Sequence, residues 1–219
     1  MKRAILIFII NIIANNIAKA QNIIYRDINE VIVSANRAQT SDNVINVQVI
    51  TKEEIENSPL QTIEDLLEYA INVDVRQRGA QGVQADISMR GGTFEQVLIM
   101  LNGIKLNDPQ TGHHTMNLPV TLEQIERIEI ITGGASRIFG NYAFTGAINI
   151  ITKIEMKNSI AISTGQNNFN SVDVNYHTSK KHLAHNMSIN HKKSDGYISG
   201  MDYKIQNYYY QLVKKNKEI

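Results

Sequence analysis

Residues 85–108, ADISMRGGTFEQVLIMLNGIKLND, are the stretch that decides the fold. Ile87–Met89 alternates apolar and polar side chains before Arg90-Gly91-Gly92, whereas Val97–Leu101 is a continuous apolar run. Asn102-Gly103 is the strongest hairpin signal in the chain, because both central positions of a type I′ turn require a positive φ. We therefore predict two or three short strands joined by glycine turns. Val97–Leu101 should be the most buried strand, because it has no polar face.

Helical and strand patterns are mixed on either side of this stretch. Thr51-x-x-Glu54 is a capping box, and Ser58-Pro59 offers a second helix start. Apolar side chains with helical spacing predict a helix of about three turns over Ile63–Ala70. The further strands predicted by alternation or apolar runs lie around Val44–Thr51, at Val73–Val75, Ile125–Ile130 and Ala147–Thr152. Too few helices alternate with strands for a doubly wound sheet, so residues 44–153 are predicted to form a small α+β domain.

The composition divides the chain near residue 150. Among 219 residues there is no cysteine, which excludes a disulfide scaffold and thiolate metal sites. Residues 21–150 carry 9 basic against 16 acidic side chains, whereas residues 151–219 carry 10 basic against 5 acidic ones. The net charge of +1 gives no indication of nucleic-acid binding.

The first 20 residues have the pattern of a secretory signal peptide. A short basic start at Lys2-Arg3 precedes an apolar run, and Ala18-Lys19-Ala20 provides the small residues of a cleavage site. The apolar run is too short for a permanent membrane helix. We predict cleavage after Ala20; the alternative is a buried N-terminal strand or helix.

Residues 154–219 have a different pattern, which consists of strands separated by clusters of Asn, Gly, Lys and Asp. The predicted strands are Ser159–Thr164, Ser171–Tyr176, Leu183–His191 and Tyr203–Leu212. Alternation at Val172 and Val174, together with the tyrosines at 208–210, is typical of transmembrane β-hairpins with aromatic residues at the membrane interface. A soluble β-meander is the alternative.

Several motifs, in the same order along the chain, resemble the TonB-dependent outer-membrane receptors. The matching segments are Glu30–Arg37 (EVIVSANR), Ile87–Gly91 (ISMRG), Leu101–Asn107 (LNGIKLN), Ile125–Ile130 with Gly133, Ser136 and Phe139-Gly140, and Ala147–Lys153 (AINIITK). The resemblance implies a plug domain over residues 44–153, followed by antiparallel transmembrane β-barrel strands over residues 154–219. It also implies that residues 21–43 hold a TonB box and a linker, although on pattern alone Glu30–Arg37 would be the first strand of the domain.

The resemblance also implies roles for individual residues. The TonB box would be Glu30, Val31, Ile32, Val33, Ser34 and Ala35, which would pair with a periplasmic TonB-type energising protein. The apical loops would bind the ligand through Arg76, Gln77, Arg78, Gln81, Gln84, Asn107, Asp108, Gln110, His113, His114 and Asn117. Arg90 and Arg127 would lock the plug to acids of the barrel, or else would be surface arginines beside their strand neighbours.

The function expected from this resemblance is outer-membrane import of a scarce, bulky nutrient of the cobalamin or metal–siderophore type. No nucleophile motif or paired carboxylates indicate an enzyme, and no cofactor is expected. His113-His114 with Met116 could hold a soft metal, but adjacent histidines project apart, so no metal site is predicted. Importers of carbohydrates or peptides belong to the same family and remain an alternative.

The expected barrel is incomplete in this sequence. A 22-stranded barrel needs several hundred residues after Lys153, and only about four strands follow it. We therefore expect either a fragment or an early stop of the reading frame. In that case the alternative function is a plug-only periplasmic binding module or a non-functional remnant.

Overall fold

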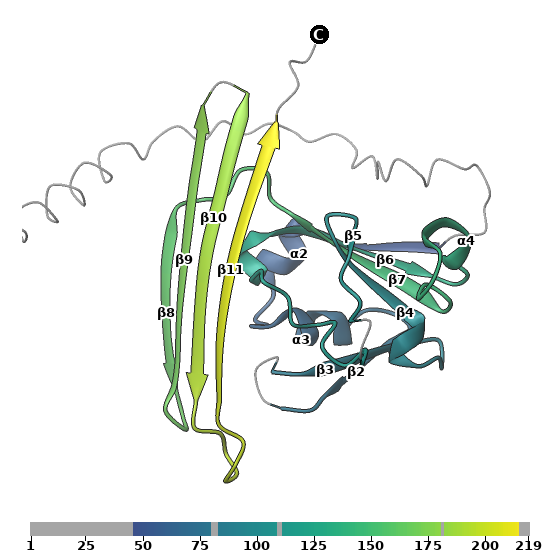
Figure 1. Cartoon of the computed structure of the whole chain (residues 1–219), viewed down its shortest axis with the longest axis horizontal. Helices are drawn as coiled ribbons and strands as arrows, with labels where there is room; N and C mark the ends of the chain where they lie inside the picture. The colour runs from purple at the N-terminus through teal and green to yellow at the C-terminus, as the bar shows by residue number, and fades with distance from the viewer. Residues whose placement is uncertain (1–45, 80–82, 109–110, 181, 215–219) are drawn as a thin grey trace, which may run out of the picture. The chain divides into compact units, whose positions relative to one another are not determined.

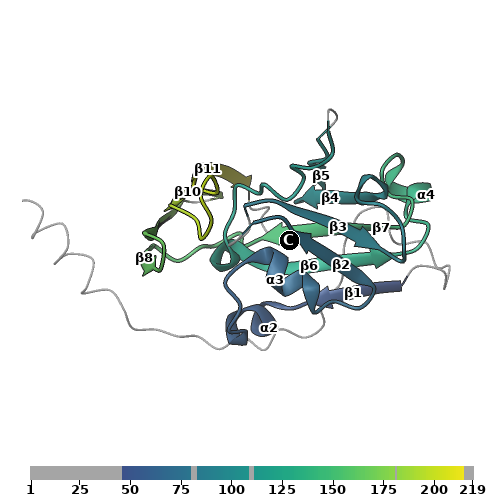
Figure 2. The same cartoon turned by 90° about the horizontal axis from the view of Figure 1, so that it is seen from below.

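The computed structural model describes residues 46–79, 83–108, 111–180 and 182–214 (Figures 1 and 2). The predicted signal peptide, linker and box therefore lie outside the described residues, as do Gln81 and Gln110. The described helices and strands are β1 Asn46–Ile50, α2 Lys52–Asn57, α3 Ile63–Glu68, β2 Val73–Gln77, β3 Ala85–Met89, β4 Val97–Leu101, β5 Ile104–Lys105, β6 Ile125–Thr132, α4 Ser136–Phe139, β7 Gly146–Thr152, β8 Ser159–Gly165, β9 Phe169–Lys180, β10 Leu183–Ser194 and β11 Tyr203–Lys214. Short 3₁₀ turns lie at Phe94–Gln96 and Leu122–Gln124.

Strand β4 lies inside a five-stranded sheet of order β1-β6-β7-β4-β5. It runs parallel to β7 and antiparallel to β5, and all five of its side chains are buried, as predicted. The turn into β5 has φ values of 52° at Asn102 and 78° at Gly103, as a type I′ turn requires. The predicted α+β architecture is confirmed for this part of the chain, which we call the α+β domain (residues 46–152).

One face of the five-stranded sheet carries the main core, which α2 and α3 cover (Figure 2). Leu66 and Leu67 on the apolar side of α3 belong to the same buried cluster as Ile99 and Ile128 of the sheet. Removing this apolar surface from water is the main stabilising contribution to the domain. The β2–β3 hairpin contributes Ile87 and other buried side chains to the same core.

The helix boundaries differ from two predictions. The second helix is capped by Thr62, whose Oγ1 accepts a hydrogen bond from the Asp65 N–H (3.1 Å), and the prediction of a cap at Ser58 was wrong. Helix α3 has six residues instead of three turns. Its spacing continues to Ala70, but there the Ala70 N–H bonds to the Leu67 carbonyl and the chain turns at Asn72, whose φ is 63°. Burial of Ala70 therefore reflects packing beyond the end of the helix.

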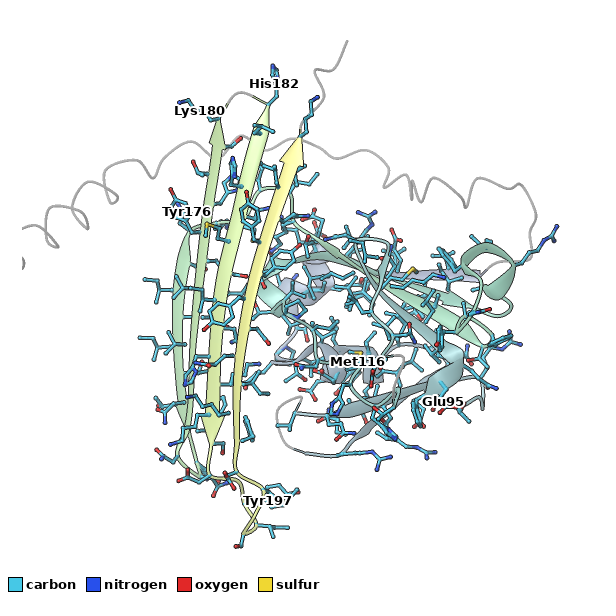
Figure 3. The ribbon with its side chains drawn as sticks, viewed as in Figure 1. Glu95, Met116, Tyr176, Lys180, His182 and Tyr197 are labelled. Carbon is cyan, nitrogen blue, oxygen red and sulfur yellow. The ribbon has the colours of Figure 1, made fainter. Side chains whose placement is uncertain are left out.

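The four remaining strands form a second sheet of order β11-β10-β9-β8, in which neighbours are antiparallel (Figure 1). Lys180 and His182 flank the β9–β10 turn at one end of this four-stranded sheet, and Tyr197 lies in the β10–β11 loop at the opposite end (Figure 3). Strands β9 and β10 extend further than predicted, because their polar ends still pair across the sheet.

The four-stranded sheet buries polar side chains and exposes apolar ones. The buried face has Ser171, Asn175, Asn186, Ser188, Asn190 and Ser194, and the exposed face has Ile160, Ile162, Val172, Tyr176, Met187, Ile189, Tyr208, Tyr210 and Leu212. A soluble meander would have the opposite alternation, so this pattern supports the prediction of barrel strands whose outer face contacts lipid. None of the helices in the described part of the chain is long and apolar enough to cross a membrane.

Polar contacts join the four-stranded sheet to the α+β domain. The Gln124 amide donates to Ser188 Oγ, and the Asn207 amide donates to the Leu118 carbonyl (3.2 Å). Tyr209 Oη lies 3.2 Å from both the Asn102 amide and Thr152 Oγ1. A single tyrosine therefore links the β4–β5 turn and the end of β7 to strand β11.

Candidate ligand-binding site

Two of the predicted ligand residues meet at one buried carboxylate. Asp86 of β3 is 4% exposed, and its Oδ2 accepts hydrogen bonds from Arg78 Nε (2.8 Å) and Nη2 (2.7 Å). Its other oxygen, Oδ1, lies 3.1 Å from Nδ1 of His113. Asp86 therefore fixes the β2–β3 loop, which carries Arg78, to the loop that carries His113.

The charge of Asp86 is stabilised by these partners. Burial alone would raise the pKa of the Asp86 carboxyl, but hydrogen bonds from His113 and Arg78, and their positive charge, hold the pKa below its ordinary value. The His113 ring also stacks on Phe94, with ring centroids 4.5 Å apart. Arg78 and His113 are consequently presented in one fixed arrangement, with Arg78 still half exposed.

A role for Asp86 was not predicted from the sequence. It follows Ala85 at the start of an alternating strand, where an acid is expected to face solvent. The only available signal was its position within the central stretch, between two loops that were both predicted to bind ligand. In the strand register of the hairpin Asp86 lies opposite Arg76, next to the last residue pair before the β2–β3 loop.

Most other predicted ligand residues make structural contacts. Asn107 accepts from the Ile99 N–H and donates to the Val97 carbonyl (3.2 Å each), so its amide continues the pairing of β4. Asp108 accepts from the Thr111 N–H (3.1 Å) and hydroxyl (2.6 Å). Of the rest, Arg76 pairs with Asp74, Gln77 donates to Asp65, the Gln84 carbonyl accepts from the Arg78 N–H, and His114 and Asn117 are exposed.

Three of the predicted ligand residues, Arg78, Asn107 and Asp108, line two separate cavities. One, of about 440 Å³, is lined by Arg78, Gly79 and Val83 together with residues of the β8–β9 and β10–β11 loops. The other, of about 520 Å³, is lined by Asn107 and Asp108. Tyr197 lines the first cavity and Glu95 lines the second; both are labelled in Figure 3.

We call the 440 Å³ cavity the loop cavity. Besides Arg78, Gly79 and Val83, its lining residues are Gln166, Asn167, Ser194, Gly196, Tyr197, Gly200, Met201, Asp202 and Tyr203. Its size is within the range of small-molecule sites, and it combines a cationic group with amides and two tyrosines. The strand-connecting loops were not predicted to contribute, because their Asn, Gly and Asp residues are equally typical of ordinary turns.

The described residues contain no group of three or more His, Asp or Glu side chains that could hold a metal ion. The acid that contacts His113 is Asp86, and His114 is exposed.

The two predicted lock arginines have different surroundings. Arg127 Nε and Nη2 each lie 2.9 Å from Oε1 of the buried Glu129, which belongs to the same strand. Glu129 Oε2 in turn accepts from the Asn149 amide (3.1 Å), whose oxygen accepts from the Gly103 N–H (2.9 Å). Within the described residues Arg90 is exposed and no ion pair involves it. The lock itself stays a prediction.

Comparison with known proteins explains this arrangement. Residues 39–147 match the family model of the TonB-dependent receptor plug domain. The chain belongs to the TonB-dependent receptor family. The α+β domain is accordingly its plug, and the four-stranded sheet continues from the plug as antiparallel barrel strands.

Similar proteins include curated transporters and solved receptors. The vitamin B12 transporter BtuB of Vibrio vulnificus is 30% identical over 68% of this chain, and that of Vibrio cholerae is 34% identical over 56%. These matches span 25% and 20% of the transporters, so the chain spans about a quarter of their length.

Solved structures share the fold. The siderophore receptor PirA from Acinetobacter baumannii is 26% identical, with a TM-score of 0.50 over 68% of this chain and 24% of the receptor. The ferric yersiniabactin uptake receptor FyuA from Yersinia pestis covers 80% of this chain and 30% of its own length, with a TM-score of 0.58 at 16% identity.

Proposed function

We propose that this chain acts in the outer membrane as a receptor that binds and imports a scarce, bulky nutrient. The observation that carries the proposal is that Arg78, which lines the loop cavity, is anchored together with His113 on the buried Asp86. A carboxylate that is held by side chains of two loops keeps a polar surface in place before the ligand arrives, which lowers the entropic cost of binding.

The outer-membrane location is supported by the four-stranded sheet. Its exposed face is apolar and its buried face is polar, as expected for strands with lipid outside and a plug inside. The family match of the plug supports the same location. Export would depend on the predicted signal peptide in residues 1–20.

We propose a cobalamin as the first substrate to test and a ferric siderophore as the second. Two curated relatives are named vitamin B12 transporters, whereas the solved receptors of similar fold are named for siderophores. The lining of the loop cavity, with its arginine, amides and tyrosines, fits the amide-rich periphery of a corrin.

The test is equilibrium dialysis of the full chain in detergent micelles against cyanocobalamin, read by the visible absorbance of the corrin. A ferric catecholate siderophore is dialysed in parallel. Tyr197→Ala removes a ring that lines the loop cavity, and we expect the Kd to rise about tenfold, equivalent to roughly 1.4 kcal/mol. Tyr69→Ala is the matched control, since Tyr69 is an exposed tyrosine that does not line this cavity.

Saturable corrin binding that is weakened by Tyr197→Ala but not by Tyr69→Ala supports the cobalamin assignment. Binding of the siderophore alone would replace that assignment within the same function. Absence of saturable binding of both probes would contradict the loop cavity as the binding site.

Energy for import is proposed to reach the receptor through Glu30–Ala35, which lies outside the described residues. If a periplasmic TonB-type protein pairs with the backbone of this segment, Ile32→Pro should abolish the interaction because it removes a ladder donor. Ile32→Val keeps the backbone and is the control. The measurement is binding of the partner's periplasmic domain to the immobilised full chain. Equal binding of both variants would mean that the segment is not a pairing strand.

A further inference from the structure

A buried acid of the plug faces the four-stranded sheet and has no role in the ligand site. Glu64 lies in α3 and is 6% exposed. It lines a cavity of about 60 Å³ that is bounded by the plug on one side and by strands β10 and β11 on the other. The polar and charged residues that line it include Thr62, Glu64, Asn190, Lys192 and Asn207.

Among the described residues that line this cavity, Asn190 has an acceptor without a donor. Asn190 of β10 is 5% exposed, and its Nδ2 donates to Asp173 Oδ1 of β9, which fixes the orientation of the amide. Among the described residues no donor reaches Asn190 Oδ1. Buried acceptors are nearly always paired, so an acceptor of this kind requires an explanation.

The surroundings of Glu64 favour its neutral form. Burial raises the pKa of the Glu64 carboxyl, and the negative charge of Asp65 on the same helix acts in the same direction. Hydrogen bonds from its own backbone N–H and from Thr62, and the charge of Lys192 on β10, act in the opposite direction but do not outweigh burial. A further acid, Asp173 on β9, accepts a hydrogen bond from the Asn190 amide.

We propose that Glu64 is a proton-binding latch between the plug and strand β10, in which its neutral carboxyl donates a hydrogen bond to Asn190 Oδ1. The bond forms directly or through one water molecule, for which a cavity of this size has room. The neutral carboxyl supplies the donor that Asn190 lacks. Once ionised, Glu64 has only acceptors to offer, and a charge is then buried against an unpaired oxygen.

The direction of the pH effect follows from this bond. A carboxyl whose folded pKa lies above its ordinary value of 4.5 stabilises the docked state most at low pH. That contribution is lost as the pH rises through the folded pKa. The seam between α3 and β10 should therefore be tight in acid and loosen toward alkaline pH, whichever nutrient the receptor binds.

The first experiment detects the proton itself. Infrared spectra of the full chain in detergent micelles, recorded from acidic to neutral pH, should show a carboxylic-acid C=O band that persists to higher pH than the bands of exposed acids and that Glu64→Gln removes. Glu68→Gln, an exposed acid on the same helix, is the matched control and should leave the band unchanged. Absence of the band from the unsubstituted chain, or its survival in Glu64→Gln, would overturn the proposal.

The second experiment measures the seam. The chain has no cysteine, so Ser188→Cys places a single thiol under the plug, where Ser188 contacts Gln124, and Tyr197→Cys is an exposed reference thiol. The quantity compared is the maleimide labelling rate at position 188 divided by the rate at position 197. This ratio corrects for the rise in thiol reactivity with pH that is common to both sites. We expect the ratio to rise severalfold from acidic to alkaline pH in the unsubstituted background and with Glu68→Gln. With Glu64→Gln, an uncharged donor, the ratio should stay low throughout.

A third variant tests the partner. Asn190→Ala removes the acceptor, so the midpoint of the labelling transition should move to lower pH, because the neutral form loses its bond. An unchanged midpoint would show that Asn190 is not the partner of the proton. A labelling ratio that rises equally with Glu64→Gln would show that another group controls the seam.

Discussion

At the scale of single residues, the plug buries three acids and satisfies each of them differently. Asp86 is held by a guanidinium and an imidazole, and Glu129 by Arg127 and an amide. For Glu64, burial raises the pKa and outweighs the hydrogen bonds from its own N–H and Thr62 and the charge of Lys192. Burial of a carboxylate is costly unless hydrogen bonds and opposite charge replace the water that it loses. The three sites should therefore respond differently to pH and to neutral substitution.

Asp86→Asn should destabilise the folded chain by about 1.5–3 kcal/mol, because the amide cannot accept the charge-assisted bonds of both Arg78 and His113. Because the pKa of Asp86 in the folded chain lies below its ordinary value of 3.8, ionised Asp86 stabilises the fold at pH values above 3.8. This stabilisation is lost as the pH falls from 3.8 through the lowered pKa. Urea unfolding as a function of pH, followed by circular dichroism, should thus show a shallower acid limb for this variant.

Asp74→Asn is the control for Asp86→Asn. It breaks the Arg76–Asp74 pair, in which both side chains are largely exposed, so the expected loss is less than about 1 kcal/mol. Similar losses for the two variants would mean that Asp86 is not an anchor.

Leu98→Ala should cost about 2–5 kcal/mol, because Leu98 is fully buried in β4 and the cavity left behind would lie inside a packed sheet. Ile104→Ala on the neighbouring β5 removes a similar side chain that is 68% exposed and should have little effect. Chemical denaturation measures both. A normal midpoint for Leu98→Ala would contradict the assignment of β4 as the centre of the core.

Residue roles in the site were less predictable than burial. An unbroken apolar run leaves no polar face, so the burial of Val97–Leu101 follows from composition alone. Loop residues such as Asn107 carry no comparable signal: an amide that binds a ligand and one that bonds the strand backbone have the same local sequence. Arg78 and His113 were predicted only as ligand residues of two separate loops, and the acid that joins them depends on a register that only the folded hairpin shows.

At the scale of elements, β3 and β7 can approach each other closely because Gly146 of β7 has no side chain. A Cβ on Gly146 would lie 2.6 Å from Met89 Sδ and 2.7 Å from the Ile131 carbonyl oxygen. Met89 could move, but the carbonyl belongs to the adjacent strand β6 and cannot move without breaking the ladder. The start of β7 is therefore restricted to glycine for reasons of space.

Gly146→Ala should consequently destabilise the plug by about 1–3 kcal/mol through overpacking. Gly134→Ala is the matched control, since a Cβ there would meet nothing within 4 Å. Thermal or chemical denaturation of both variants gives the comparison. Equal stability of the two variants would mean that the β6–β7 ladder adapts more easily than its geometry indicates.

The types of the helices and strands were predicted from local sequence patterns, whereas the residues at which they begin and end depend on tertiary contacts. The capping box at Thr51 appeared as predicted, with the Thr51 N–H 2.7 Å from Glu54 Oε2. Helix α3 ended early because Asn72 turns the chain into β2, although the apolar spacing continued to Ala70. Strands β9 and β10 extended into polar residues because neighbouring strands supplied hydrogen-bond partners that no single-strand pattern contains.

At the scale of the whole molecule, the two sheets should differ in their dependence on solvent. The core of the plug is apolar and is covered by helices, whereas the four-stranded sheet exposes its apolar side chains. Water disfavours such an exposed band, and detergent or lipid covers it. The plug should therefore hold its structure in either medium, and the four-stranded sheet should require an apolar one.

Hydrogen exchange tests this difference. Without detergent we expect strong amide protection at Val97–Leu101 and Ile125–Ile130, and little at Ser171–Tyr176 or Leu183–His191. In micelles the second pair should become protected, most of all in β10, which is paired on both sides. Strong protection of all four segments in detergent-free solution would favour a water-soluble β-domain and contradict the lipid-facing assignment.

The strand order of the plug also has a consequence for the time that folding takes. Strand β4 pairs with β7, with Leu98 opposite Ala147. Strand β1 pairs with β6, with Val49 opposite Glu129, and so cannot pair until β6 has been made. The first half of the plug can close only its helices, the β2–β3 hairpin and the two-residue pairing of β4 with β5, because β6 and β7, the other partners of β1 and β4, are encoded later. High contact order of this kind slows folding and leaves apolar strands exposed meanwhile. A chain exported N-terminus first would therefore carry Val97–Leu101 paired only with the short β5 until β7 (Gly146–Thr152) had crossed, and it would need a holding chaperone during that interval.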